Sequence, residues 1–216
     1  MADIKNSEIY YIIGTAYAGK STMVKMLAEK YDGIACEENY HERLMDEKLD
    51  KDQFPCLCYT RDLEDWRDFI RRTPDEYEAW IDGVSKECEI LELQILEELK
   101  KQGRRIFVDT NISIETLKKI SDPEHVLVML ADQKTSVDRF FERPDREKQF
   151  LYQLLMNEDD PEAAMANFRE CLLRINSKER YQRYLDSGFP VLLRDDKRSV
   201  EETLAIAAEL LKLKKQ

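Results

Sequence analysis

Residues 14–21 read Gly-Thr-Ala-Tyr-Ala-Gly-Lys-Ser, a loop bounded by glycines that ends in a lysine and a hydroxyl side chain. Backbone N–H groups of a loop with this spacing surround phosphate oxygens, and the N-terminus of a following helix adds partial positive charge. We expect Lys20 to reach the β- and γ-phosphates of ATP, and the Ser21 hydroxyl to bind Mg²⁺. The expected nucleotide-binding residues in this part of the chain are Gly14, Thr15, Ala16, Tyr17, Ala18, Gly19, Lys20, Ser21 and Thr22.

This segment, which we call the glycine loop, works as a phosphate site only between a strand and a helix. Residues 9–13 form an apolar run of strand character, and residues 22–30 have a helical pattern. The alternative is a tight strand-to-helix turn that needs its glycines for backbone conformation alone. The flanking strand and helix favour the phosphate site.

Two acidic positions directly follow apolar runs. In a parallel α/β sheet, ligands bind beyond the carboxyl ends of the strands. Asp109, after Arg105–Val108, is therefore expected near the glycine loop, where it would hold Mg²⁺ directly or through water; the alternative is a polar strand end that caps the next segment. Glu38 follows a weaker run and would accept the proton of an acceptor hydroxyl, with Glu37 as the second choice. A solvated acidic helix start is the alternative for this pair.

Several arginines could stabilise charge that develops on a phosphoryl group. Arg139, Arg143 and Arg146 surround a proline after the fourth apolar run and could lie on a flap that closes over ATP, with Arg139 contacting the nucleotide and the other two acting in catalysis. A helix face of paired charges is the alternative. Arg61 could bind an anionic acceptor, but an ordinary surface arginine is as compatible with the sequence.

The elements that must position these side chains follow from hydrophobic patterns. Helical patterns separate five short apolar runs, which predicts β-α-β units with right-handed crossovers and a parallel sheet covered on both faces. Thr73 and Ser199 each begin a capping sequence, and Ser177 begins another charged helix. The five expected strands are residues 9–13, 33–36, 105–108, 125–130 and 190–193.

The connection from about residue 39 to residue 101 contains no strand-like run and is too long for a plain crossover. We expect it to be mostly helical, with a break at Phe54-Pro55 and a long helix from Thr73 to about Gln102. An insertion of this kind commonly builds the acceptor side of a cleft, and extra helical packing is the alternative.

Composition limits the partners. Charged residues make up 37% of the 216 residues and the net charge is −11, which disfavours nucleic acid and anionic membranes. The sequence has no apolar run of membrane-spanning length and no signal-peptide core at its start, so a cytoplasmic location is expected. Five cysteines and two histidines indicate neither a disulfide framework nor a zinc site. One domain over residues 1–216 is expected, as a monomer or a homodimer.

The chain resembles the small-molecule and nucleotide kinases of the P-loop class, which include adenylate, shikimate and deoxynucleoside kinase types. The resemblance rests on residues 12–22, 106–109 and 191–200 and on the arginine cluster, and only the first is specific. It implies a three-layer α/β fold with strand order 2-3-1-4-5, an arginine lid at about 139–150, and an adenine site near residues 195–198. Many kinase loops carry a third glycine where this chain has Tyr17, and the acceptor signatures of the adenylate and shikimate types are absent.

The resemblance and the residues together favour an ATP- and Mg²⁺-dependent phosphotransferase that moves the γ-phosphoryl group to a small hydroxylated or phosphorylated metabolite. A nucleotide-binding regulatory switch, or a slow NTP hydrolase acting with a protein partner, is the alternative from another class. A nucleotide binder without turnover is a third, because Tyr17 departs from the common loop.

Overall fold

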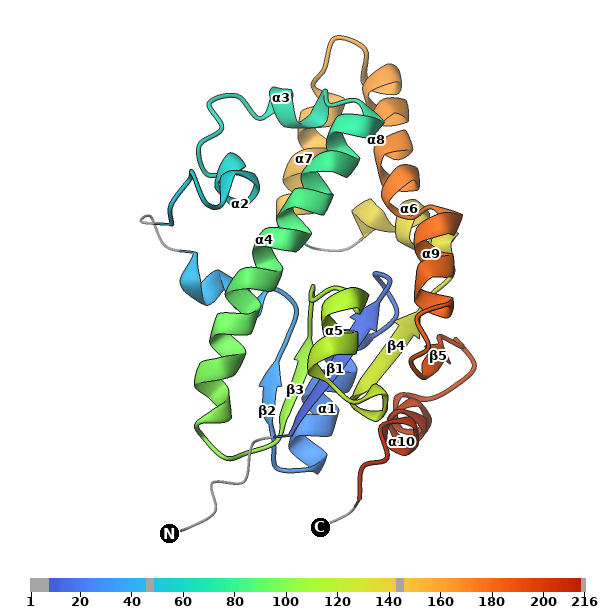
Figure 1. Cartoon of the computed structure of the whole chain (residues 1–216). Coiled ribbons are helices and arrows are strands. Elements are labelled where there is room, and N and C mark those ends of the chain that lie inside the picture. The colour runs from blue at the N-terminus through green and yellow to red at the C-terminus, as the bar shows by residue number, and fades with distance from the viewer. Residues whose placement is uncertain (1–7, 46–48, 143–145, 215–216) are drawn as a thin grey trace.

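The computed structural model describes residues 8–45, 49–142 and 146–214, which form a parallel five-stranded sheet with helices on both faces (Figure 1). The strand order is β2-β3-β1-β4-β5, as the sequence predicts. Every pairing is parallel, with Ile12 of β1 opposite both Asp109 of β3 and Leu127 of β4. The strands are β1 (Ile9–Gly14), β2 (Ile34–Cys36), β3 (Ile106–Asp109), β4 (Val126–Leu130) and β5 (Val191–Leu193).

The helices alternate with these strands, and their bounds fix where the site residues lie. The α-helices are α1 (Lys20–Lys30), α2 (Pro55–Tyr59), α3 (Arg67–Ile70), α4 (Pro74–Lys100), α5 (Ile114–Ile120), α6 (Gln133–Asp138), α7 (Arg146–Met156), α8 (Pro161–Ile175), α9 (Lys178–Leu185) and α10 (Val200–Leu210). Three 3₁₀ turns, η1 (Tyr40–Leu44), η2 (Pro123–His125) and η3 (Phe140–Glu142), complete the described part. No helix in these ranges is long and apolar enough to cross a membrane.

Alternating side chains of the strands fill two cores, one on each face of the sheet. Tyr10 and Ile12 pack with apolar side chains of α1 and α10. Ile9, Tyr11 and Ile13 point the other way, toward the C-terminal half of α4, α5 and α9. Because both faces are covered, the central strands are apolar except at the carboxyl end of β3, where Asp109 lies. The carboxyl ends of the strands point toward the helices drawn above the sheet in Figure 1.

Helix α4 joins the sheet to a helical lobe. Its start carries the predicted capping box, in which Thr73 and Glu76 exchange hydrogen bonds between side chain and backbone. The N-terminal half of α4 packs with α3, α7 and α8 around Phe69, Tyr77, Leu155 and Phe168. The insertion after β2 and the helices after β4 therefore share one core above the carboxyl ends of the strands.

The insertion is mostly helical, as expected, but only short helical elements precede α4. The expected break at Phe54-Pro55 falls where α2 begins, with Pro55 as its first residue, where the missing N–H costs no hydrogen bond. The segment expected as a lid, 139–150, comprises η3 and the start of α7, and residues 143–145 lie outside the described part.

Candidate active site

The glycine loop leaves β1 at the centre of the sheet, where the backbone tolerates no side chain. Gly14 has φ 133°, and a Cβ atom added there would lie 1.9 Å from the Met129 carbonyl oxygen. Gly19 has φ 90° and precedes the first residue of α1. Tyr17 also adopts a left-handed conformation, with φ 63°, which a bulky residue rarely does. The loop therefore takes a shape that its glycines permit and its surroundings maintain.

Strand β4 and the segment after it hold the loop. The Thr15 backbone N–H donates to the Met129 carbonyl at 3.1 Å, and the Ala131 N–H donates to the Thr15 hydroxyl at 2.8 Å. The Ser136 hydroxyl donates to the Ala16 carbonyl at 3.3 Å. These bonds all come from the protein itself and fix the first half of the loop, so they pre-organise its backbone.

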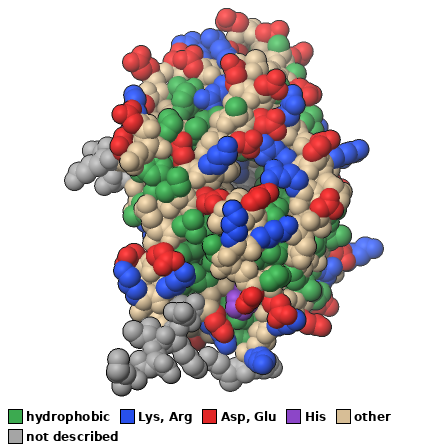
Figure 2. Space-filling view, in the orientation of Figure 1, with side chains coloured by type: hydrophobic (Ala, Val, Ile, Leu, Met, Phe, Trp, Pro, Cys, Tyr) green, Lys and Arg blue, Asp and Glu red, His purple; other side chains and the backbone are tan. Residues whose placement is uncertain are grey.

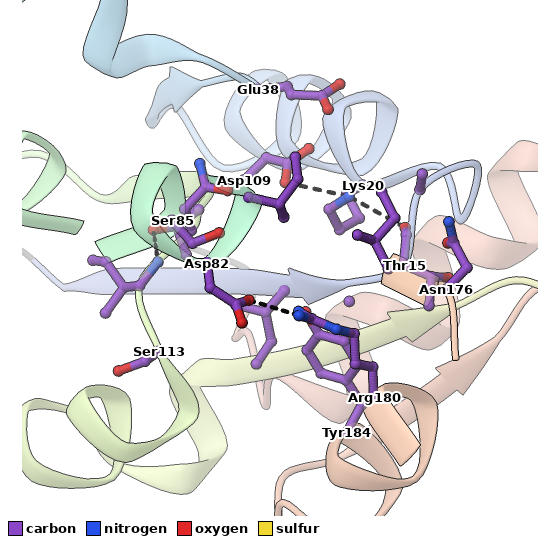
Figure 3. Close-up of a pocket in the computed structure, with 18 of the residues that line it drawn as sticks. Thr15, Lys20, Glu38, Asp82, Ser85, Asp109, Ser113, Asn176, Arg180 and Tyr184 are labelled. Atoms are coloured by element: carbon purple, nitrogen blue, oxygen red, sulfur yellow. Dashed lines mark hydrogen bonds and ion pairs between the residues drawn. The ribbon is translucent and has the colours of Figure 1, made fainter. Parts of the chain in front are cut away.

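Lys20, Ser21 and Asp109 converge at the mouth of the loop, and Figure 3 shows Lys20 and Asp109 of this group. The Lys20 ammonium group lies 3.6 Å from an Asp109 carboxylate oxygen and donates to the Thr15 carbonyl at 3.2 Å. The Ser21 hydroxyl donates to the other Asp109 oxygen at 2.8 Å. The three groups come from α1 and β3 because parallel strands end at one edge of the sheet, where the helix after β1 also begins.

Asp109 is only 4% exposed. Burial raises the pKa of its carboxyl above the usual range, while the Lys20 charge and the Ser21 hydrogen bond act in the opposite direction and the Glu38 charge adds to the increase. A hydroxyl and a carboxylate are the hard oxygen ligands that Mg²⁺ binds alongside waters and phosphate oxygens. Ser21 and Asp109 therefore fit the predicted metal. Elsewhere in the described part, no cluster of three His, Cys, Asp or Glu side chains could hold a metal ion.

Tyr17 at the loop tip contacts two other segments. Its phenolic hydroxyl donates to the Arg139 carbonyl at 2.8 Å, directly after α6. Its own carbonyl accepts a hydrogen bond from the Arg194 guanidinium, directly after β5. Tyr17 thus joins the tip of the glycine loop to the segment after α6 and to the segment after β5.

Two cavities meet at this point. The smaller has a volume of about 230 Å³ and is lined by the second half of the glycine loop, Thr22, Glu38 and Asp109. The larger, of about 890 Å³, extends between α4, the β3–α5 connection and α9. In Figure 2 a hollow with basic side chains around it lies over the same region. Lys20, Glu38 and Asp109 line both cavities, so the two cavities adjoin at these three side chains.

The wall opposite the glycine loop is polar. Arg180 of α9 donates to Asp82 of α4 at 2.7 Å and to Glu78 at 3.0 Å, across the larger cavity (Figure 3). Ser85 and Asn111 line the same space. Sequence reasoning missed these four cavity-lining residues. Side chains of this kind on α4 and α9 have the same sequence pattern as solvated helix faces, and only the tertiary fold places them around one cavity.

The two glutamates predicted after β2, Glu37 and Glu38, point to different places. Glu38 lines both cavities, whereas Glu37 points to α1 and forms an ion pair with Lys25 at 2.8 Å. Asn39 has φ 65°, so the backbone turns sharply after Glu38 into η1. The geometry therefore brings Glu38 and not Glu37 to the expected acceptor position.

Of the predicted arginines, the three that the structure describes line neither cavity. Arg61 instead bonds its neighbour Asp62 at 2.8 Å, and its expected contact with an anionic acceptor stays a prediction. Arg139 lies 3.7 Å from Glu142, half-exposed, and contributes its carbonyl rather than its guanidinium to the glycine loop. Arg146 is exposed at the start of α7 and also lines neither cavity, while Arg143 lies outside the described residues.

The segment expected near adenine, residues 195–198, follows β5 and lines neither cavity. Its side chains are engaged locally, as Arg198 donates to the Leu193 carbonyl at 3.3 Å. Arg194, one residue earlier, is the member of this connection that reaches the glycine loop.

Comparison with known proteins adds the following. No protein-family model matches the chain, and no curated protein matches it in sequence. Among solved structures, the chain is similar to a crystal structure of NadR protein in complex with NR, with a TM-score of 0.34 and 16% identity. The match covers 99% of this chain and 53% of that one, so this chain spans about half the length of that protein. Similarity at this level identifies neither a family nor an activity, and we interpret the site from its own geometry.

Proposed function

We propose that the protein is a phosphotransferase that binds MgATP in the glycine loop and moves the γ-phosphoryl group to a hydroxyl of a small molecule bound between α4 and α9. One observation carries the proposal. Lys20, Ser21 and Asp109 meet at the end of a pre-organised loop, at the junction of a phosphate-sized cavity and one large enough for a second substrate.

Each group has a distinct part in the proposed reaction. The loop N–H groups and the Lys20 ammonium would bind the phosphates and stabilise charge that develops on the transferred group. Ser21 and Asp109 would hold Mg²⁺, which when bound supplies charge neutralisation at the phosphate oxygens. Glu38, at the junction of the cavities, would orient the acceptor hydroxyl and accept its proton.

The far wall favours an acceptor that offers hydroxyl groups. Arg180 is already neutralised by Asp82 and Glu78, and Arg183 lies 3.3 Å from Glu115. The second Asp82 oxygen makes no hydrogen bond within the described part and can accept one from a hydroxyl group of the acceptor. These paired charges support binding of an uncharged hydroxylated molecule over a phosphorylated one, for which unpaired arginines would be the better match.

Nucleotide binding and ADP release test the proposal, with two variants on one helix. Lys20→Ala removes the cation at the loop. Lys25→Ala removes an exposed cation five residues further along α1, whose partner is Glu37. We expect Lys20→Ala to abolish ADP release across a panel of hydroxylated metabolites while the protein stays folded, and Lys25→Ala to retain it. Unchanged turnover in Lys20→Ala would refute the proposal.

The same assay separates the alternative class. A regulatory switch or slow hydrolase would release ADP at a rate that no small molecule changes and that a protein partner alters. The large cavity beside the glycine loop supports the transferase, because a hydrolase needs room for only one water molecule there.

A further inference from the structure

A glutamate in α4 lies at the centre of a buried polar network beside the larger cavity. Glu92 is 0% exposed, and each of its carboxylate oxygens accepts two hydrogen bonds. One oxygen accepts from His41 Nδ1 at 3.0 Å and from Asn111 Nδ2 at 2.8 Å. The other accepts from the Thr110 hydroxyl at 2.5 Å and from the Asn111 backbone N–H at 2.9 Å. A carboxylate has room for about four donors, so this one is saturated.

The network determines which ring nitrogen of His41 carries the hydrogen. Because Glu92 only accepts, His41 donates through Nδ1, and Nε2 is left to accept. Cys88 lies 3.3 Å from Nε2 and can donate its thiol hydrogen. Every polar atom of the chain Cys88–His41–Glu92 then has a matching partner, which a buried polar group requires.

A thiol, an imidazole and a carboxylate in this order also occur in enzymes with a cysteine nucleophile. Here Cys88 is 2% exposed, and burial raises the pKa of its thiol to about 12. His41 and Glu92 are buried as well. No substrate could reach the sulfur and no thiolate is available, so the arrangement is not a nucleophilic site.

What distinguishes Glu92 is the position of the segments that it holds. His41 follows Glu38 by three residues and lies in η1, after β2, and Asn111 follows Asp109 by two and lies in the connection after β3. Glu38, Asn111 and Asp109 all line the larger cavity. One buried carboxylate on the insertion helix therefore fastens both strand-end connections of the expected acceptor site.

We propose that Glu92 is a positioning residue for the transfer reaction, which sets Glu38 and Asn111 against the acceptor while leaving the glycine loop untouched. This inference rests on the proposed function. It also predicts a separation of effects, because the glycine loop is held by β4 and Ser136 and not by Glu92. Loss of the carboxylate would loosen the acceptor side alone.

A second glutamate on the same helix provides a matched control. Glu87 is also buried and accepts two hydrogen bonds, from the Cys56 and Leu57 N–H groups at the start of α2. Neither Glu87 nor α2 lines the cavities. Glu87→Gln and Glu92→Gln thus make one chemical change at two buried positions of α4, and each leaves a donor facing donors.

Hydrogen exchange by mass spectrometry reads the positioning without any substrate. We expect Glu92→Gln to speed exchange in peptides covering residues 37–45 and 110–113, and Glu87→Gln to speed it at residues 54–60 instead. Both variants should lower Tm, by roughly 3–10 °C for the loss of one or two hydrogen bonds to a charged group. Unaltered exchange at 37–45 and 110–113 in Glu92→Gln would overturn the proposal.

Activity supplies the second readout, with MgATP as the probe and water or an accepted metabolite as acceptor. We expect Glu92→Gln to lower the rate of ADP release by up to about 10²-fold, the effect of a displacement near 1 Å, with unchanged affinity for MgATP. Glu87→Gln should lower neither. Equal losses in the two variants, or a lost affinity for MgATP in Glu92→Gln, would show a structural role only. Failure of the wild type to bind MgATP would refute the proposed function, and the exchange experiment would still decide the positioning.

A double variant tests the hydrogen-bond logic itself. In Glu92→Gln combined with Asn111→Asp, the new amide donates to the new carboxylate, and His41 can accept through Nδ1 and donate through Nε2 to Cys88. We expect exchange at residues 37–45 to return toward the wild-type rate. Exchange as fast as in Glu92→Gln alone would contradict the network as drawn.

Discussion

Asp109→Asn should make the metal-free protein more stable and the nucleotide complex weaker. Burial raises the pKa of Asp109, so the folded protein holds the proton more tightly than the unfolded chain does. The group favours folding below its unfolded pKa, and that contribution is lost as pH rises through the higher folded-state pKa. At pH 7 the buried carboxylate therefore opposes folding.

The structure sets the direction of the effect, and Tm measures its size. The amide keeps an oxygen for Lys20, and the Ser21 hydroxyl can accept from the amide nitrogen instead of donating to the carboxylate. In a chain of this length, each kcal/mol of relief raises Tm by roughly 2–4 °C. With MgATP at one hundred times its Kd, the wild type should gain about 2.7 kcal/mol, or roughly 5–11 °C. The variant should lose most of that gain with its Mg²⁺ ligand.

Thermal unfolding followed by circular dichroism at pH 7 measures the two Tm values. The first is that of the metal-free protein in EDTA, and the second is that of the complex with Mg²⁺ and a non-hydrolysable ATP analogue. The variant should unfold above the wild type in EDTA and below it in the complex. Asp159→Asn, the same change at an exposed acid, should alter neither value. A lower Tm for Asp109→Asn in EDTA would refute the reasoning about desolvation, and an undiminished gain with the analogue would refute the metal role.

Three further outcomes follow from the site. Gly14→Ala should prevent folding or cost several kcal/mol in urea unfolding, because its Cβ would meet the Met129 carbonyl at 1.9 Å; a stable variant would contradict that contact. Glu38→Gln should slow ADP release by about 10²-fold or more in single-turnover kinetics with MgATP affinity unchanged, and reduced affinity would refute its role as base. Asp82→Asn should raise the acceptor KM and leave ATP binding unchanged in calorimetry, and an unaffected KM would place the acceptor elsewhere.

The parts of the fold that local chemistry determines were predictable. The apolar runs of the five strands and the capping sequences at Thr73 and Ser199 were read correctly, because burial on both faces and helix ends leave short-range signals. The break expected at Phe54-Pro55 falls at the start of α2. A proline disrupts a helix interior but is well tolerated at the first position, and the sequence alone did not show on which side of Pro55 the helix lay.

The site was predictable where one rule of topology applies and not where packing decides. Strand ends share an edge, which brings Asp109 to Ser21 across 88 positions of sequence. Arg61, expected at the acceptor, bonds Asp62 instead, and nothing local in the sequence says which way an insertion folds. Arg180 was missed because its partners lie about one hundred positions earlier.

Glu92 did leave a signal that was overlooked. It lies on the apolar stripe of α4 formed by Cys88, Leu91 and Ile95, where an acid is rarely found unless it is paired. An acid in such a stripe indicates a buried polar contact, although it does not name the partners. Those come from η1 and the end of β3, which no local pattern relates to α4.

The acids of α4 also bear on the order of folding. Glu87, Glu89 and Glu92 accept backbone N–H groups from two segments, the start of α2 before the helix (Cys56, Leu57) and the β3–α5 connection after it (Asn111, Ser113). Neither segment has its final hydrogen bonds until α4 is in place. Helical lobe and sheet should therefore form in one cooperative transition, and residues 39–101 expressed alone should not fold.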